Sequence, residues 1–443
     1  MYRLVSKLLL YGNVGSDPVL KELCGICREV DAQNGDREEL IRRIYRQVRT
    51  VLEVSTKYGF DKNLWHNYLT YLLLMDENPF SVTCEKIGVK DGTVNRFALN
   101  DFKVFLELFH YDFGKLEAYL GIDCFSCLND YRAIQKPELM YNKNVSDKVR
   151  ELSERLETAA DEKEFFTCVT DFYRAYGVGL LGMNKAFRIR EREDNEVEFL
   201  PINNMDKVVL DDLVGYEIQK QKLVDNTKAF VEGRKANNVL LYGDSGTGKS
   251  TSIKAIVNEF YGSGLRMIEI YKYQFKDLSK IIAQIKNRNY KFIIYMDDLS
   301  FEEFETDYKY LKAVIEGGLE KKPENVLIYA TSNRRHLIRE NYADKEGDIR
   351  SDMHTSDTVQ EKLSLAYRFG VTIYFGAPVK KEFQQILEVL AQRNGIDMPL
   401  EQLYLEANAW ELSHGGRSGR TAQQFIDHLL GKDPEEKNEE GTH

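Results

Sequence analysis

The chain has 443 residues, enough for two or three domains, and an apolar content of 43% that can supply buried cores. Its 61 basic and 71 acidic residues give a formal net charge of −10. This balance argues against a protein that coats nucleic acid through a broad basic surface, although a local basic patch stays open. The apolar runs near the N-terminus, Leu8–Leu10 and Leu72–Leu74, are far too short to span a bilayer, so we expect a soluble cytoplasmic protein without membrane contact.

Residues 1–204 have the pattern of a mainly helical N-terminal domain. Helices are expected over Asp36–Tyr58 and Asp161–Tyr176, where apolar residues form one stripe at helical spacing. Two short β-prone runs, Phe187–Arg190 and Val197–Leu200, flank a polar turn and predict a small hairpin near the end of the domain. No motif of this region carries recognisable chemistry, so we expect it to serve recognition or regulation.

All of the cysteines lie in this N-terminal region. Two pairs, Cys24 with Cys27 and Cys124 with Cys127, have the C-x-x-C spacing of zinc ligands. The pairs are far apart in sequence, and each lies in an apolar, helix-like context where cysteine is a common core residue. We therefore expect reduced, buried thiols, with a structural zinc site as the alternative.

From residue 205 onward, short β-prone runs alternate with helical stretches, which is typical of an α/β fold with a parallel, doubly wound sheet. We expect the α/β core over residues 205–376, a helical lid over 377–430 and a disordered acidic tail over 431–443. The strands expected in a five-stranded parallel sheet are Val239–Tyr242, Leu265–Tyr271, Phe292–Asp297, Val326–Thr331 and Val371–Phe375.

Residues 243–250 read Gly-Asp-Ser-Gly-Thr-Gly-Lys-Ser and fit G-x-x-x-x-G-K-[ST], the phosphate-binding P-loop. A β-prone run precedes the octapeptide and a helical pattern, Lys249–Phe260, follows it, as the motif requires. Lys249 is expected to reach the β and γ phosphates, and the Ser250 hydroxyl to ligate Mg²⁺. We therefore expect ATP and Mg²⁺ as cofactors. The residues expected to bind the nucleotide here are Gly243, Asp244, Ser245, Gly246, Thr247, Gly248, Lys249, Ser250 and Thr251.

The run Phe292–Asp298 is an apolar strand that ends in two carboxylates, which is the Walker B pattern. We expect Asp297 to hold Mg²⁺, and Asp298 to orient or deprotonate the attacking water. Glu302 lies one helical turn further on if that segment is helical, and it is a second candidate base.

The run Val326–Asn333 is another apolar strand with polar residues at its end, and at this point the chain resembles the AAA+ ATPase superfamily. The resemblance implies that Asn333 is the sensor 1 residue, which contacts the γ-phosphate or the water between the two Walker segments. Thr331 and Ser332 are the alternatives. An ordinary strand-end turn would use the same residue types.

Further segments carry the same resemblance. Gly215 and Tyr216 match the segment that packs on adenine. Arg368, ahead of the last strand, matches the arginine finger that projects into the neighbouring subunit's site. Near the last helix, Arg420 fits the sensor 2 arginine better than Arg417 does.

The resemblance covers about residues 205–430 and is closest to a family of predicted bacterial AAA+ ATP-binding proteins of unassigned cellular function. Asp298 departs from the Glu that most AAA+ enzymes have, and its shorter side chain predicts slow hydrolysis. Where polypeptide-threading relatives carry an aromatic pore loop, this chain has Tyr273 and Phe275; we expect them to pack in the core, with a role as pore aromatics as the alternative. The charged segment Arg334–Val359 is expected to contact a neighbouring subunit.

The leading hypothesis is an ATP hydrolase that works in a homo-oligomeric ring, such as a hexamer, with ATP between subunits. Its output would be a conformational change in an unknown macromolecular partner; nucleic acid is one candidate, although the charge does not point to it. The alternative is an ATP-dependent assembly scaffold with negligible turnover. A P-loop kinase of small molecules fits least: it would need an acceptor pocket and a closing lid near the P-loop, whereas the chain has a sensor-like strand end, a finger-like arginine and a C-terminal helical lid.

Overall fold

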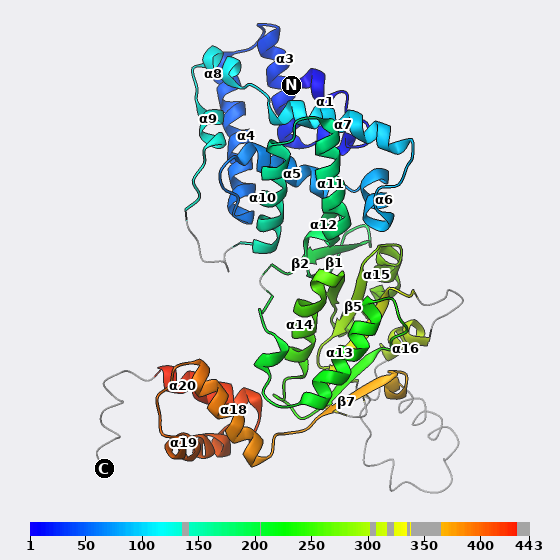
Figure 1. The fold of residues 1–443 in the computed structure, drawn as a ribbon, viewed down its shortest axis with the longest axis vertical. Helices are drawn as coiled ribbons and strands as arrows, with labels where there is room; N and C mark the ends of the chain where they lie inside the picture. The colour runs from blue at the N-terminus through cyan, green and yellow to red at the C-terminus, as the bar shows by residue number, and fades with distance from the viewer. Residues whose placement is uncertain are drawn as a thin grey trace. The chain divides into compact units, whose positions relative to one another are not determined.

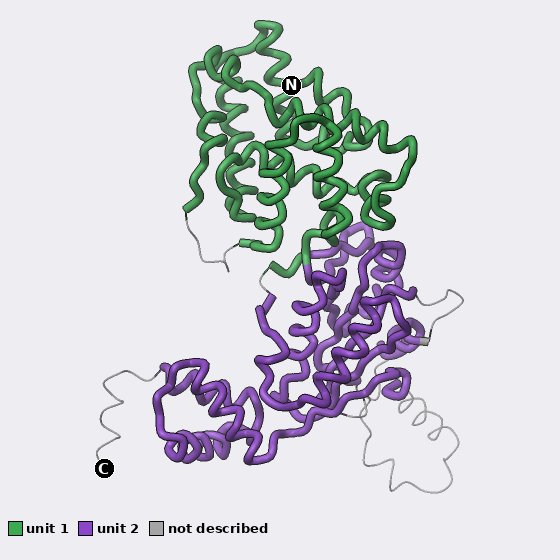
Figure 2. Tube along the Cα trace, viewed as in Figure 1, with its two compact units in different colours: residues 1–184, 201–204 green, residues 185–200, 205–443 purple. Residues whose placement is uncertain are grey.

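The structure, a computed structural model, divides the chain into two compact units (Figure 2). Unit 1 consists of Met1–Asn184 with Pro201–Asn204, and unit 2 of Lys185–Leu200 with Met205–His443. The residues that the structure describes are 1–134, 141–203, 205–301, 307–316, 323–334, 337 and 365–431.

Unit 1 is built from α-helices (Figure 1). The longest, α4 (Arg37–Tyr58), begins after Asp36, whose carboxylate accepts the Glu38 backbone N–H, and ends at Gly59 with φ 68°. Asp161 caps α11 (Glu162–Tyr176) in the same way. Both helices were predicted from the sequence. The others are α1 (Tyr2–Val5), α2 (Gly12–Gly15), α3 (Pro18–Asp31), α5 (Leu64–Met75), α6 (Pro79–Ile87), α7 (Val94–Phe109), α8 (Gly114–Leu120), α9 (Cys124–Asn129), α10 (Lys143–Glu157) and α12 (Gly179–Met183).

Aromatic side chains form the centre of unit 1. Phe102 is fully buried, with its ring centroid 5.5 Å from Phe165, 5.6 Å from Tyr11 and 5.8 Å from Phe80. Such edge-to-face and tilted pairs contribute about 0.5–1.5 kcal/mol each beyond the area they bury. The aromatic content of this region is therefore explained by core packing.

The cysteines of unit 1 are unpaired thiols, and burial raises the pKa of Cys84 and of Cys124 to about 11. The second cysteines of the two C-x-x-C pairs differ in burial: Cys27 is buried and Cys127 is exposed. Among the described residues, no three His, Cys, Asp or Glu side chains gather as metal ligands. The absence of zinc stays a prediction.

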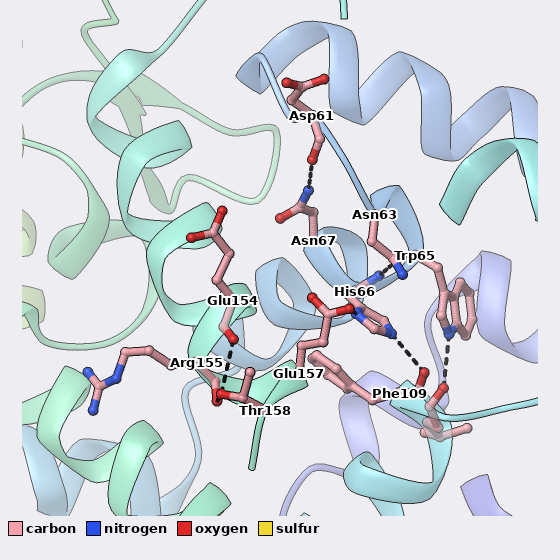
Figure 3. A network of polar contacts seen from close by, with 11 residues as sticks. Asp61, Asn63, Trp65, His66, Asn67, Phe109, Glu154, Arg155, Glu157 and Thr158 are labelled. Carbon is pink, nitrogen blue, oxygen red and sulfur yellow. Dashed lines mark hydrogen bonds and ion pairs between the residues drawn. The ribbon is translucent and has the colours of Figure 1, made fainter. Parts of the chain in front are cut away.

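A polar network surrounds the buried His66 of α5 (Figure 3). Its Nε2 donates to the Phe109 carbonyl at 2.8 Å, and the two rings stack with centroids 4.7 Å apart. Its Nδ1 is buried without a hydrogen bond among the described residues, 3.8 Å from the Glu157 carboxylate. Burial lowers the pKa of His66 and outweighs the Phe109 hydrogen bond and Glu157, which act in the other direction.

Unit 2 contains a seven-stranded sheet with the order β2-β1-β4-β5-β6-β3-β7. Parallel pairs run from β1 through to β7. The strands are β1 (Ala186–Glu191), β2 (Val197–Pro201), β3 (Val239–Gly243), β4 (Leu265–Glu269), β5 (Lys291–Met296), β6 (Val326–Ser332) and β7 (Val371–Phe375).

The five-stranded sheet expected from the sequence is wrong by two strands. The hairpin was predicted to close the N-terminal domain, but its first strand, β1, pairs in parallel with β4, with Ala186 opposite Met267. The hairpin extends the sheet of unit 2 because β4 would otherwise be an uncovered edge with unpaired backbone groups.

Helices flank the sheet, and α18 (Lys380–Arg393), α19 (Leu400–Ser413) and α20 (Gly419–Gly431) form a C-terminal bundle with its own apolar core (Figure 1). The remaining elements are the 3₁₀ turns η2 (Leu210–Asp212), η3 (Tyr261–Ser263) and η4 (Lys272–Asp277), with helices α13 (Glu217–Val231), α14 (Lys249–Phe260), α15 (Leu278–Ile285) and α16 (Tyr308–Glu316). In the part of the chain that the structure describes, no helix combines the length and apolar character needed to traverse a bilayer.

Candidate functional site

The glycine loop 243–248 joins the end of β3 to the start of α14. Gly243 has φ 133°, and a Cβ there would lie 2.1 Å from the Phe375 carbonyl oxygen, so only glycine fits beside β7. Gly246 has φ 75°, and a Cβ there would meet the side chains of Ser418 and Arg420 from the C-terminal bundle. The loop therefore depends on glycine for its turn and for close contacts on two sides.

Lys249, the first residue of α14, is a buried cation. Its Nζ donates to the carbonyls of Gly243 at 2.9 Å and Asp244 at 2.6 Å, and to Asn333 Oδ1 at 3.1 Å. Burial lowers the pKa of Lys249, and the nearby carboxylates, chiefly Asp244, oppose that shift. The ammonium is thus held at the end of the loop, inside the protein.

Asp297, directly after β5, receives hydrogen bonds from two neighbouring elements. The Ser250 hydroxyl donates to Asp297 Oδ1 at 2.7 Å, and the Thr331 hydroxyl of β6 donates to the same oxygen at 2.5 Å. Burial acts to raise the pKa of Asp297, but these hydrogen bonds outweigh it and hold the pKa below its ordinary value. Asp297 is therefore a carboxylate at neutral pH.

Asp298 has a left-handed backbone, with φ 49°, which is unusual for a residue other than glycine. Its backbone N–H donates to Thr331 Oγ1 at 2.9 Å, and its side-chain Oδ1 accepts Asn333 Nδ2 at 2.8 Å. Because Asn333 also accepts from Lys249, one amide links the loop lysine to the second carboxylate. The three candidates for the sensor 1 position therefore have different surroundings. Asn333 bridges the glycine-loop lysine and Asp298, whereas Thr331 contacts both Asp297 and Asp298. Ser332 is buried.

These residues share one cavity of about 440 Å³. Its cationic side chains are Lys249 and Arg420, and its carboxylates are Asp297 and Asp298. Such a lining suits an anion on one side and a hard divalent cation on the other. The full lining is Ser245, Gly246, Thr247, Gly248, Lys249, Ser250, Thr251, Asp297, Asp298, Thr331, Asn333 and Arg420.

A second, mainly apolar cavity of about 520 Å³ adjoins the first, because Thr247, Gly248, Thr251 and Arg420 line both. Its other lining residues come from the segment ahead of α13 and from the bundle: Val208, Asp212, Leu213, Val214, Tyr216, Ile386, Leu390, Arg393, Asn394, Gly419 and Gln423. The combined site therefore has a polar end and an apolar end, like a nucleotide.

Several contacts attach the bundle to the core around this site. The Arg420 backbone N–H donates to the Gly246 carbonyl at 3.2 Å. Between β7 and α18, the Asp244 carboxylate accepts the Ala377 N–H at 2.7 Å, and the Tyr216 hydroxyl donates to the Gly376 carbonyl at 2.8 Å. Tyr216 thus lines the apolar cavity and also fixes the connection to the bundle.

Other predicted site residues lie elsewhere. Arg368 precedes β7, which is parallel to β3, and Val371 of β7 pairs with Val239 at the start of β3. The glycine loop follows the other end of β3, so Arg368 and its own glycine loop lie at opposite ends of these strands. Gly215, with φ 81°, is not among the described residues that line either cavity. Glu302 lies outside the described residues, as do most of the segment 334–359 and the tail 432–443.

The two aromatic residues after β4 differ from each other. Phe275 is buried, as expected for a core residue. Tyr273 is 70% exposed and stacks on Tyr271 with centroids 5.9 Å apart, so the expectation that it packs in the core is wrong. The polar start of η4 keeps it at the surface.

Sequence reasoning missed the cavity residues that the bundle and η2 supply, among them Asp212, Arg393 and Gln423. They belong to no motif, and a charged residue on a helix is ordinarily a solvated one. Their distance in sequence from the glycine loop left no signal that they share its cavity.

Residues 182–433 match the family described as "Protein of unknown function (DUF815)". The chain belongs to this family. The match agrees with the sequence resemblance, and the chain is a member of the AAA+ superfamily with unassigned function.

No match was found among curated proteins. Among solved structures, the chain is similar to the Thermotoga maritima RuvB Holliday junction branch migration motor, with 15% identity and a TM-score of 0.32 over 52% of this chain and 76% of that one. A single-residue variant of the same RuvB gives 14% and 0.31 over the same shares. A likeness this distant does not indicate what the DUF815 chain acts on.

Proposed function

We propose that unit 2 binds ATP with Mg²⁺ and hydrolyses it, and that turnover drives a conformational change in a macromolecular partner. The observation that carries the proposal is the hydrogen-bonded series Lys249, Asn333 and Asp298, which lies beside the Ser250–Asp297 pair in one cavity. It brings a cation for phosphate, two carboxylates and a polar bridge between them to one place.

In this proposal the polar cavity takes the phosphates and the apolar cavity takes the base. Ser250 and Asp297 would hold Mg²⁺, which when bound neutralises charge on the phosphates. Magnesium is usually held by one or two carboxylates together with phosphate oxygens and water, so this donor set fits it. Asp298 would orient or deprotonate the attacking water, and Asn333 would keep that carboxylate in position.

Arg368 is proposed to act on a neighbouring subunit of a homo-oligomeric ring. Its place before β7, at the opposite ends of the strands from its own glycine loop, supports action in trans. A guanidinium is suited to this task because it stays charged and offers fixed donors to phosphoryl oxygens.

Steady-state phosphate release tests the proposed hydrolysis. Asp298→Asn keeps the shape of the side chain and removes the base, so turnover should fall by about 100-fold or more, while ATP affinity changes by less than about threefold. Asp225→Asn, which replaces an exposed carboxylate on α13, is the matched control and should be silent. Normal turnover by the Asp298 variant would contradict the assignment.

The conformation of Asp298 also favours a second candidate, an ATP-dependent scaffold with negligible turnover. Its carboxylate is short, starts from a left-handed backbone and already accepts Asn333. A scaffold would assemble on ATP without releasing phosphate. Sedimentation with ATP and with ADP, run beside the phosphate assay on the wild type, separates the two functions.

A further inference from the structure

A single arginine joins the C-terminal bundle to the segment ahead of the core. Arg393, the last residue of α18, donates from Nη2 to the Asp211 carbonyl at 2.7 Å and from Nη1 to the Asp212 carbonyl at 3.3 Å. The same Nη1 lies 3.4 Å from the Asp212 carboxylate. One guanidinium therefore makes three contacts with η2.

These contacts lie at the wall of the apolar cavity. Arg393 and Asp212 both line it, and apolar lining residues lie close to each of them in the chain. Leu213 belongs to the η2 side, and Leu390 to the α18 side. The arginine thus joins the two walls between which the base would lie.

The η2 side of this junction is fixed independently. Asp212 Oδ2 accepts the Val209 N–H at 2.8 Å, and the Leu213 carbonyl accepts Lys220 Nζ of α13 at 2.9 Å. The Leu213 side chain also lies 2.5 Å from where a Cβ on Gly248 would be. Since η2 is anchored to the core, the element that Arg393 holds in place is α18.

We propose that Arg393 is a positioning residue for the nucleotide: it keeps α18 against η2, so that the apolar cavity grips the base, and breaking its contacts speeds nucleotide release. This rests on the proposed function, in which the cavity takes the base of ATP. Arg393 is 41% exposed and Asp212 43%, so solvent competes for the contacts and they can break reversibly.

The chemistry of the contacts predicts a graded series of variants. Two of the three acceptors are backbone carbonyls, each bound by a different nitrogen of one planar guanidinium, and a lysine at this position does not reproduce that fork of donors. Arg393→Gln and Arg393→Lys should therefore have similar effects. Asp212→Asn should have a smaller one, because it keeps both carbonyls and an amide oxygen.

The test is the dissociation rate of a fluorescent N-methylanthraniloyl ADP from the full-length protein by stopped flow. Arg393→Gln should release it about tenfold faster, equivalent to ~1.4 kcal/mol, with an unchanged association rate. Arg234→Gln is the matched control, since Arg234 is an arginine paired with Glu232 on the surface of unit 2, outside both cavities. High salt should speed release from the wild type only toward the rate of Asp212→Asn, because it screens the ion pair and leaves the two carbonyl contacts.

Two further measurements separate a positioning role from a merely structural one. A positioning role predicts the same unfolding temperature without nucleotide for Arg393→Gln and wild type, and a higher KM for ATP with unchanged kcat. A structural role predicts a lower unfolding temperature for the variant. Release of the probe at the wild-type rate from both Arg393→Gln and Asp212→Asn would overturn the inference. A lower unfolding temperature of Arg393→Gln than of wild type without nucleotide would overturn it as well. Failure of the wild type itself to bind the probe would instead overturn the proposed function.

Discussion

The two units of this chain satisfy their buried polar groups in different ways. In unit 1, the fully buried Asp101 carboxylate accepts the backbone N–H groups of Leu9, Leu10 and Tyr11 at 2.7–3.1 Å. Its charge is used to hold a chain segment in place. In unit 2, Asp297 and Asp298 are hydrogen-bonded as well, but both line a cavity.

The difference teaches how to separate a structural carboxylate from a functional one. Burial and hydrogen bonding are common to both, since an unpaired buried charge is costly anywhere. What distinguishes unit 2 is that groups of opposite charge line the same solvent-accessible space. The following experiments test whether chemistry is confined to unit 2 and packing governs unit 1.

The largest expected effect concerns Arg368. Arg368→Ala should bind ATP nearly as well as wild type yet hydrolyse it about 10³–10⁵-fold more slowly, since arginine fingers contribute about that much. Mixing it with Lys249→Ala should restore activity above that of either variant, because an intact loop then meets an intact arginine. Mixed assemblies without any recovery would show that Arg368 does not act between subunits.

A core substitution in unit 1 should affect stability and leave nucleotide binding alone. Phe102→Ala should destabilise unit 1 by about 3–5 kcal/mol, because it opens a cavity among aromatic rings. Unfolding in urea is followed by Trp65 in a Trp410→Phe background, where the only tryptophan left lies in unit 1. Phe97→Ala, on the same helix but 45% exposed, is the control and should cost far less. A large loss of ATP affinity in Phe102→Ala would break the comparison.

Lys249→Ala should weaken ATP binding by about 1.5–3 kcal/mol, or roughly 10–150-fold, because it removes a charge-assisted contact with phosphate. Isothermal titration with a nonhydrolysable analogue measures it. Lys254→Ala is the control: it removes a half-buried lysine of the same helix that pairs with Asp206 and lines neither cavity, so ATP affinity should not change. An affinity of Lys249→Ala within about threefold of wild type would contradict the phosphate assignment.

The smallest effect is a pH dependence of unit 1. The folded-state pKa of His66 is lowered below its ordinary value near 6.5, so the unfolded chain binds the proton more tightly. This contribution to stability is complete above about pH 6.5 and is lost as the pH falls through the folded pKa. The groups that face His66 are Glu157, which raises its pKa, and His110, which lowers it.

Urea unfolding between pH 7.5 and 5, followed by Trp65, measures this loss of stability. His66→Gln should flatten the dependence, since glutamine does not titrate in this range, whereas His110→Gln at an exposed position should leave most of it. An unchanged slope in His66→Gln would assign the pH dependence to other groups.

Motif reasoning placed the polar cavity well because its residues follow strands that the sequence marks clearly. Gly243, Asp297 and Asn333 end or follow neighbouring strands, and in parallel sheets such ends gather at one edge. The apolar runs of β3, β5 and β6 limit the register in which these strands can pair. The sequence therefore predicted which side chains meet, although not that Asn333 would bridge Lys249 and Asp298.

Two other features could not be predicted. The pairing of β1 with β4 joins segments far apart in the chain, and nothing in a short β-prone run specifies a remote partner. The contacts of Arg393 go mainly to backbone carbonyls, which every residue carries. A basic residue in the last turn of a helix is common for reasons of helix electrostatics alone, so it drew no attention.

The return of the chain through the hairpin has a practical consequence for isolating unit 2. The polypeptide leaves and re-enters the two units at 184–185, 200–201 and 204–205, so no single cut separates them cleanly. A fragment that begins at residue 205, where the motif pattern starts, would strip β1 from β4 and expose an edge prone to intermolecular pairing. A fragment that begins at residue 182, where the family match starts, retains the hairpin and should stay monodisperse where the shorter one aggregates.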